Sequence, residues 1–282
     1  MDYCTPLETH ARTIVLFHFH AHFELCRPRI ELLRRFNPGV EIFGLYGGES
    51  ARVDEARRLE SSGVNHVFEN EGRSPAWNKK NTDLAVAGWY RSVGRTLPFG
   101  RVHVVQWDLL FFAPLDRMYP SLSPEAVALT GLVPLEAIAH FWDWTANAPL
   151  SIESERLLSQ TRERFGFTGG SYACIGPGYS LSRRFLELYS QLEIDDTGHD
   201  ELRLPLFAQI LGFELADTGF YPRWMDPKVE RVFNADAQEV DPAVVESELV
   251  RPEGRRVFHP CRDHFDELTI ARLVSELSGH QT

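Results

Sequence analysis

Short apolar runs alternate with segments of helical periodicity along the first hundred residues. The runs at 13–20, 40–46, 65–68 and 102–107 have the length and composition of buried strands. Between them, apolar side chains recur every three or four residues, which is the spacing of one helix face. Strands separated by helices favour right-handed crossovers and a mainly parallel sheet. The predicted fold class is therefore α/β, with a central sheet flanked by helices.

Turn residues delimit three helices in this half. The first is predicted to have Pro28 in its opening turn, the second runs from Ser50 to Gly63, and the third spans 77–93. Ligands of such sheets bind beyond the carboxyl ends of the strands. The residues at those ends are the first candidates for chemistry.

The second half is less regular. Its predicted elements are a strand at 126–130, a long loop at 134–150, helices at 151–165, 181–192 and 206–211, strands at 172–175 and 213–216, a polar stretch to 254, a short apolar run at 257–258 and a last helix at 263–277. A Gly-Pro-Gly turn at 176–178 is expected to end the strand before it. No repeat or linker interrupts the chain, which favours one domain over 1–282.

Composition narrows the class of protein. Hydrophobic residues make up 43% of the 282 residues, enough to bury a sizeable core, so an intrinsically disordered chain is excluded. The net charge of −11 disfavours a nucleic-acid or anionic-membrane surface. Four widely spaced cysteines fit a reduced, cytoplasmic protein, and the apolar run at 13–23 is too short for a membrane span. The oligomeric state is left open.

The strand at 102–107 leads directly to a carboxylate. Asp108 follows it, and an apolar run with Pro114 and Leu115 comes next. At the ligand-binding edge of a sheet, such a carboxylate can hold a hard divalent cation through oxygen. The alternative is that Asp108 only caps the turn after the strand.

This segment resembles the strand and Asp-x-Asp region of glycosyltransferases with the GT-A fold, which use nucleotide-sugar donors. The resemblance implies that Asp108 reaches the Mn²⁺ or Mg²⁺ bound to the donor diphosphate. Gln106 stands where the family motif has its first Asp. Its amide can hydrogen-bond a ribose or a metal-bound water but brings no charge, which puts metal dependence in question.

Three further segments occur in the order that the resemblance implies. Asn78–Asp83 opens the helix before Asp108 and offers Lys80 and Asp83 to the donor. Asp200 and Glu201 match the acidic element of inverting transferases, with Glu201 as the base that takes the acceptor proton and Asp200 beside it. The resemblance also makes His259 a metal ligand or diphosphate contact and Arg262 a phosphate contact. Each segment also has a structural reading, as a helix start or a packed turn.

The resemblance also implies which residues contact the donor nucleotide and the acceptor. For the donor nucleotide they are Phe19, His20, Tyr46, Gly47, Gln106 and Trp107. For the acceptor they are Trp142, Asp143, Trp144, Gly170, Ser171 and Tyr172. Tryptophan faces stack on sugar rings and an acid binds hydroxyls, although both tryptophans are equally suited to anchoring a loop in the core.

The resemblance implies a single GT-A-like domain whose residues 13–115 bind the nucleotide sugar and whose residues 116–282 bind the acceptor. The expected activity is metal-assisted transfer of a sugar from a UDP- or GDP-sugar to the hydroxyl of a sugar, glycan or small-molecule acceptor.

Two alternatives stay open. His18, His20 and His22 alternate along the first strand, which would place three imidazoles on one face for zinc or a similar metal. That pattern resembles metal-dependent amidohydrolases, which are (β/α)₈ barrels. The missing first carboxylate at Gln106 supports a third reading, a sugar-nucleotide-binding module without catalysis.

Overall fold

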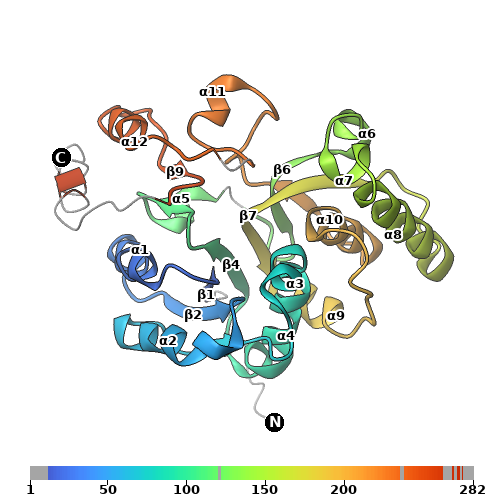
Figure 1. Cartoon of the computed structure of the whole chain (residues 1–282), viewed down its shortest axis with the longest axis horizontal. Coiled ribbons are helices and arrows are strands. Elements are labelled where there is room, and N and C mark those ends of the chain that lie inside the picture. The colour runs from blue at the N-terminus through green and yellow to red at the C-terminus, as the bar shows by residue number, and fades with distance from the viewer. Residues whose placement is uncertain are drawn as a thin grey trace, which may run out of the picture.

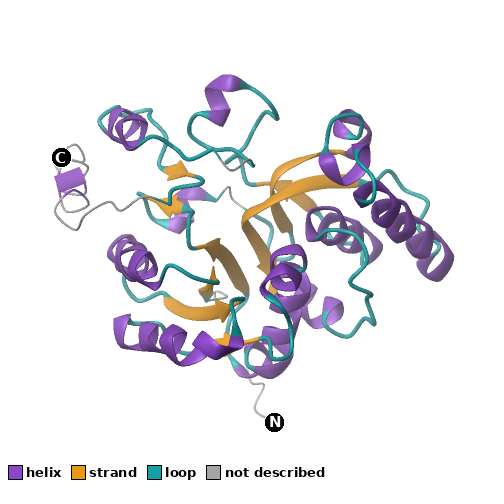
Figure 2. Cartoon of the chain, viewed as in Figure 1, coloured by secondary structure: helices purple, strands orange, loops and turns teal. Residues whose placement is uncertain are grey.

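One seven-stranded sheet runs through the centre of the protein with helices on both of its faces (Figure 1; Figure 2). The computed structural model describes residues 12–119, 122–235 and 238–262, together with 269, 272, 273 and 275. The strand order is β3-β2-β1-β4-β7-β6-β8, and a separate two-stranded ribbon pairs β5 with β9. Among the described residues, none of the helices has both the length and the apolar character needed to cross a bilayer.

The elements have the following bounds. The strands are β1 (Thr13–Phe19), β2 (Glu41–Tyr46), β3 (Val67–Glu69), β4 (Arg101–Gln106), β5 (Leu110–Phe111), β6 (Val127–Pro134), β7 (Tyr172–Ser182), β8 (Leu215–Asp217) and β9 (Val257–Phe258). The α-helices are α1 (Phe23–Phe36), α2 (Val53–Arg57), α3 (Pro75–Lys80), α4 (Thr82–Ser92), α5 (Leu115–Met118), α6 (Leu135–Ile138), α7 (Asp143–Ala146), α8 (Leu150–Phe165), α9 (Arg183–Tyr189), α10 (Asp200–Ile210), α11 (Pro227–Glu230) and α12 (Pro242–Leu249). Short 3₁₀ turns occupy Ser50–Arg52, Arg58–Ser62 and Gly94–Thr96.

The expected α/β class and mainly parallel sheet are confirmed. Strands β3, β2, β1 and β4 are mutually parallel, and β8 is parallel to β6. Strand β7 lies antiparallel between β4 and β6 and so joins the two halves of the chain in one sheet. The carboxyl ends of β1, β2 and β4 therefore meet at one edge.

Alternation along β1 divides the core into two layers. Val15, Phe17 and Phe19 face the layer that includes α1, and Ile14 and Leu16 face the layer that includes α4. All five side chains are fully buried. Full burial of such a side chain stabilises the folded state by about 1.5–3 kcal/mol, so the central strands hold the sheet edge firmly in place.

Two predicted helix boundaries in the first half are wrong. Helix α1 begins at Phe23, before Pro28, because Phe23, Leu25 and Cys26 already add a buried face. The helix predicted at 77–93 is broken at Asn81 into α3 and α4. Both the backbone and the side-chain N–H of Asn81 donate to the carbonyl of Trp77, at 2.9 Å each, and this ends α3.

The Gly-Pro-Gly segment at 176–178 does not end a strand, contrary to the prediction. Strand β7 continues through it, with Thr130 opposite Ile175 and Ala128 opposite Ser180. Two residues of β6 thus span the same length as five of β7, which makes the segment a bulge. Gly178 supplies a positive φ of 81° there.

Other differences lie in the second half. The loop predicted at 134–150 contains α6 and α7, and α10 begins at Asp200, six residues before the predicted start. The polar stretch to 254 contains α11 and α12, each opened by an Asp cap and a Pro at the first helical turn. Most of the helix predicted at 263–277 lies outside the described residues.

Candidate functional site

Asp108 lies at the sheet edge where the parallel strands end. It follows β4, and the backbone N–H of Trp107 donates to the carbonyl of His18 at 2.9 Å, which ties the turn to the end of β1. The side chain of Asp108 is almost completely buried. A buried carboxylate needs partners to remain charged.

The ribbon of β5 and β9 supplies the first partner. It pairs Leu110 with Phe258, which places His259 beside Asp108. The His259 ring nitrogen Nδ1 lies 2.8 Å from the carbonyl oxygen of Asn234, and Nε2 lies 3.6 Å from Asp108 Oδ1. Because a carbonyl oxygen can only accept, Nδ1 is the donor in the first contact. The second contact shows that Nε2 is directed at the carboxylate.

Arg262 supplies the second partner. Its Nε lies 3.5 Å from Asp108 Oδ2. Burial alone would raise the pKa of Asp108, but His259 and Arg262 outweigh it and lower the pKa to about 2. The carboxylate is therefore ionised throughout the physiological range.

Asp108 and His259 suit a divalent cation. A carboxylate oxygen and an imidazole Nε2 are ligands for Mn²⁺, and a carbonyl on Nδ1 is the usual support of a metal-binding histidine. In the described part of the chain, no group of three or more His, Cys, Asp or Glu is placed to hold a metal. A cation at this pair would complete its coordination with oxygens of a bound ligand or water.

The end of β2 is close to this edge. A Cβ added to Gly47 would lie 3.0 Å from Asn78 Cβ and 3.1 Å from His18 Nε2. The side-chain amide of Asn78 donates to the carbonyl of Gly47 at 3.3 Å. Asn78, on α3, is thus a buried polar neighbour of the predicted donor residue Gly47.

Several other predicted donor residues have different surroundings. Phe19 and Tyr46 are core residues, with ring centroids 5.5 Å apart, and the Tyr46 hydroxyl donates to the carbonyl of Glu49. Trp107 is also mostly buried, and its ring stacks on His22 at 4.7 Å and meets His20 edge-on at 5.8 Å. At the end of β1, the backbone carbonyl of Phe19 accepts from the backbone N–H of Gly47 at 2.8 Å.

Lys80 and Asp83 are not brought to Asp108. Lys80 forms an ion pair with Glu153 of α8. Asp83 is buried and binds the guanidinium of Arg203 through both carboxylate oxygens, at 2.6 and 2.7 Å. The Tyr189 hydroxyl also donates to Asp83. The structure therefore gives Asp83 a place in an internal ion pair.

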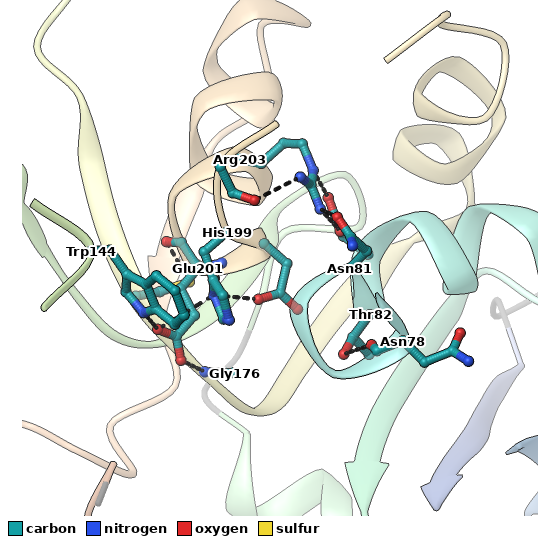
Figure 3. A network of polar contacts seen from close by, with 12 residues as sticks. Asn78, Asn81, Thr82, Trp144, Gly176, His199, Glu201 and Arg203 are labelled. Atoms are coloured by element: carbon teal, nitrogen blue, oxygen red, sulfur yellow. Dashed lines mark hydrogen bonds and ion pairs between the residues drawn. The ribbon is translucent and has the colours of Figure 1, made fainter. Parts of the chain in front are cut away.

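Glu201 forms the centre of a second polar cluster (Figure 3). Its Oε1 accepts from the backbone N–H of Gly176 at 2.8 Å, and its Oε2 accepts from Trp144 Nε1 at 3.0 Å. Burial raises the pKa of Glu201, and the neighbouring Asp200 adds to the rise, whereas His199 and the two hydrogen bonds oppose it. A carboxylate with a raised pKa is suited to accept a proton near neutral pH.

The sequence did not lead us to predict that Arg203 positions the start of α10, which carries Glu201. It is completely buried on α10, and besides Asp83 it donates to Asn81 Oδ1 and to the carbonyls of Thr197 and Gly198. These bonds fix the start of α10, and with it Glu201, against α4 (Figure 3). A single arginine in the otherwise apolar run 202–208 was the available signal.

Gly176 lies close to both Gln106 and Glu201. A Cβ added there would lie 3.5 Å from Gln106 Nε2 and 3.6 Å from Glu201 Oε1. Gln106 is separated from Asp108 by one residue. The bulge in β7 thus places a glycine beside both Glu201 and the end of β4, the strand that Asp108 follows.

The predicted acceptor residues separate into two sets. Trp144 contacts Glu201 directly, whereas Trp142 is buried against Trp224. The other four have different partners. Asp143 accepts from Asn147, the carbonyls of Gly170 and Ser171 accept from Gln209 and Leu135, and Tyr172 pairs with Pro134.

The three histidines near the N-terminus do not share one strand face, contrary to the alternation that the hydrolase alternative requires. Strand β1 ends at Phe19, and His22 is the N-cap of α1 with a φ of 55°. His18 is buried, and burial together with His20 lowers its pKa to about 4. The open seven-stranded sheet is also not an eight-stranded barrel.

Comparison with known proteins gives structural matches only. No protein-family model and no curated protein matches the sequence. The solved structures that align include the bifunctional glycosyltransferase WbbM (10% identity, 97% of this chain and 50% of that one, TM-score 0.45). A second is glucosyl-3-phosphoglycerate synthase from Mycobacterium tuberculosis with Mn²⁺, UDP and glucosyl-3-phosphoglycerate (15% identity, 74% of this chain and 70% of that one, TM-score 0.40). A third is an active-site mutant of LgtC (13% identity, 94% of this chain and 95% of that one, TM-score 0.42). The chain spans about half the length of WbbM.

Proposed function

We propose that this protein is a glycosyltransferase that moves a sugar from a nucleotide-diphosphate sugar to an acceptor hydroxyl. The observation that carries the proposal is that Gly176 lies beside both Glu201 and Gln106, the last residue of β4, two residues before Asp108. Asp108 is an ionised carboxylate with an imidazole directed at it, and Glu201 is a carboxylate with a raised pKa. Inverting sugar transfer from a diphosphate needs both a site for the leaving anion and a base for the acceptor hydroxyl.

Asp108 and His259 form the donor side. They would hold Mn²⁺ or Mg²⁺, and such a cation neutralises the charge that develops on a departing diphosphate. Arg262 lies beside Asp108 and can donate to a phosphate oxygen. Gln106 contributes a neutral amide between the donor side and Gly176, suited to a hydroxyl of the sugar or ribose.

Glu201 forms the acceptor side. It takes the proton of the acceptor hydroxyl while that oxygen bonds to the anomeric carbon, and the bond from this carbon to the phosphate oxygen breaks with its electron pair leaving on the diphosphate. Gly176 and Trp144 each donate to one oxygen of Glu201, which fixes the carboxylate plane and leaves further lone pairs for the acceptor. A single displacement of this kind inverts the anomeric centre.

The donor side is tested by thermal unfolding with UDP, GDP, CDP or dTDP, each with and without Mn²⁺. One nucleotide should raise the Tm, and by more when Mn²⁺ is present. Asp108→Ala should abolish the Mn²⁺-dependent part of the rise. Glu155→Ala, which removes an exposed acid from α8, is the matched control and should respond like the wild type. Wild-type behaviour of Asp108→Ala would contradict the metal assignment.

The acceptor side is tested by turnover. Release of free nucleoside diphosphate from a nucleotide sugar should require an acceptor. Glu201→Gln should bind nucleotide like the wild type but transfer about 10²–10⁴-fold more slowly, the usual contribution of a general base. Nucleotide binding without any release would identify a non-catalytic binding module instead. Loss of nucleotide binding in Glu201→Gln would move this residue to the donor side.

A further inference from the structure

An imidazole lies inside the Glu201 cluster. His199 is the N-cap of α10, its side chain is 10% exposed, and its ring stacks on Trp144 with centroids 3.9 Å apart. Its Nδ1 lies 2.8 Å from Asp200 Oδ1 and 3.6 Å from Glu201 Oε2. One edge of a buried ring therefore faces two carboxylates (Figure 3 shows His199 with Glu201 and Trp144).

The position of the proton on His199 follows from the partners of Nδ1. This atom also lies 3.3 Å from the backbone nitrogen of Glu201, where an unprotonated Nδ1 would accept a hydrogen bond. In that state Asp200 Oδ1 would lack a donor, because among the described residues no hydrogen bond reaches this buried oxygen. A proton on Nδ1 supplies the donor, at the shorter of the two contacts.

The charges around His199 favour the same state. Burial lowers its pKa, but Asp200 and Glu201 outweigh burial, so that the pKa is raised above that of a free histidine. Arg203, on the same helix, opposes the rise, but its guanidinium is bound to Asp83. Of the neighbours on other elements, Trp144 and Gly176 carry no charge, and the thiol of Cys174 on β7 contacts the Glu201 carbonyl at 3.3 Å.

We propose that His199 is a positioning residue for the base of the transfer reaction. As an imidazolium it holds Asp200 and Glu201 in one cluster and keeps Glu201 ionised, ready for the acceptor proton. This inference rests on the proposed function. The acceptor proton moves to Glu201 while the proton of His199 stays on Nδ1, so the cluster passes from one net negative charge to none. Without the imidazolium, no positive charge at Nδ1 would offset the repulsion between the carboxylates of Asp200 and Glu201.

His199→Asn separates the charge from the helix cap. Asparagine is a favoured N-cap residue, so the variant can still support the start of α10 while the cation is lost. The pKa of Glu201 should then rise further, and the acidic limb of the kcat–pH profile should move to higher pH by about one unit or more. Nucleotide affinity should not change. His66→Asn, which removes an exposed imidazole beside Glu60, is the matched control and should leave the profile in place.

Proton NMR of the imidazole Cε1–H groups tests the protonation state without any substrate. The resonance missing from His199→Asn should titrate above the ordinary histidine pKa of about 6.5. Asp200→Asn and Glu201→Gln should each lower that midpoint. A midpoint below the ordinary value would overturn the inference, and so would an acidic limb that stays in place in His199→Asn while kcat falls. Absence of turnover with every nucleotide sugar would count against the proposed function, and the titration would still decide whether His199 is an imidazolium.

Discussion

Removal of Arg203 should be among the most destabilising single changes in the protein. Its side chain and that of Asp83 are both completely buried, and the two form a bidentate ion pair between α10 and α4. Arg203→Met keeps most of the apolar volume but leaves Asp83 with only the Tyr189 hydroxyl as a side-chain donor in the described part of the chain. The change therefore isolates a buried negative charge.

The expected cost follows from the contacts that are lost. Breaking a buried ion pair by removing one partner costs about 3–5 kcal/mol, because the remaining charge is uncompensated. Arg203 also donates to Asn81 Oδ1 at 2.8 Å and to two backbone carbonyls, and these acceptors would lose their donor. We therefore expect Arg203→Met to lower the free energy of unfolding by at least about 3 kcal/mol, a large part of the 5–15 kcal/mol typical of a domain.

Equilibrium urea unfolding, followed by tryptophan fluorescence, measures this cost. Arg156→Met on the exposed side of α8 is the matched control and should change stability by less than about 0.5 kcal/mol. The double variant Arg203→Met with Asp83→Asn should lose less than the sum of the two single variants, by about 1–3 kcal/mol, because the isolated charge is gone. A loss below about 1 kcal/mol in Arg203→Met would refute the reasoning. If that variant does not fold, Arg203→Lys, which keeps the charge but not the fork, should show an intermediate loss.

Three glycines give further predictions. Gly48→Ala should lower the free energy of unfolding, measured by urea unfolding, by more than about 1 kcal/mol, because its Cβ would lie 2.1 Å from the carbonyl oxygen of His20. The control is Gly170→Ala, whose Cβ would have no neighbour within 4 Å, and it should unfold like the wild type. Gly176→Ala should also fold normally, since its Cβ makes only ordinary contacts at 3.5 and 3.6 Å, but transfer should slow at least about tenfold because the methyl group occupies the space between the donor and acceptor sides. Normal transfer by Gly176→Ala would show that the sugar does not pass this point.

Local sequence patterns were sufficient to predict the strands that form the sheet edge. The runs at 13–20, 40–46 and 102–107 became β1, β2 and β4 within one residue at each end, because a continuous apolar run of that length can be buried on both faces only in a central strand. Asp108 was found for the same reason, as the first carboxylate after such a strand. The directions of Phe19 and Tyr46 into the core follow the alternation of their strands, a signal that the sequence did contain.

The sequence by itself thus determined the central strands and the presence of carboxylates after them, because apolar periodicity is a property of neighbouring residues. Only the tertiary structure decided which distant groups meet. Arg203 lies 120 residues from Asp83, and the bulge at Gly176 brings β7 to Gln106 and Glu201. His259 reaches Asp108 through a two-stranded ribbon of two residues each. Such contacts depend on strand register and helix packing over the whole chain. A buried charge needs a partner, but no local pattern identifies which distant residue that partner is.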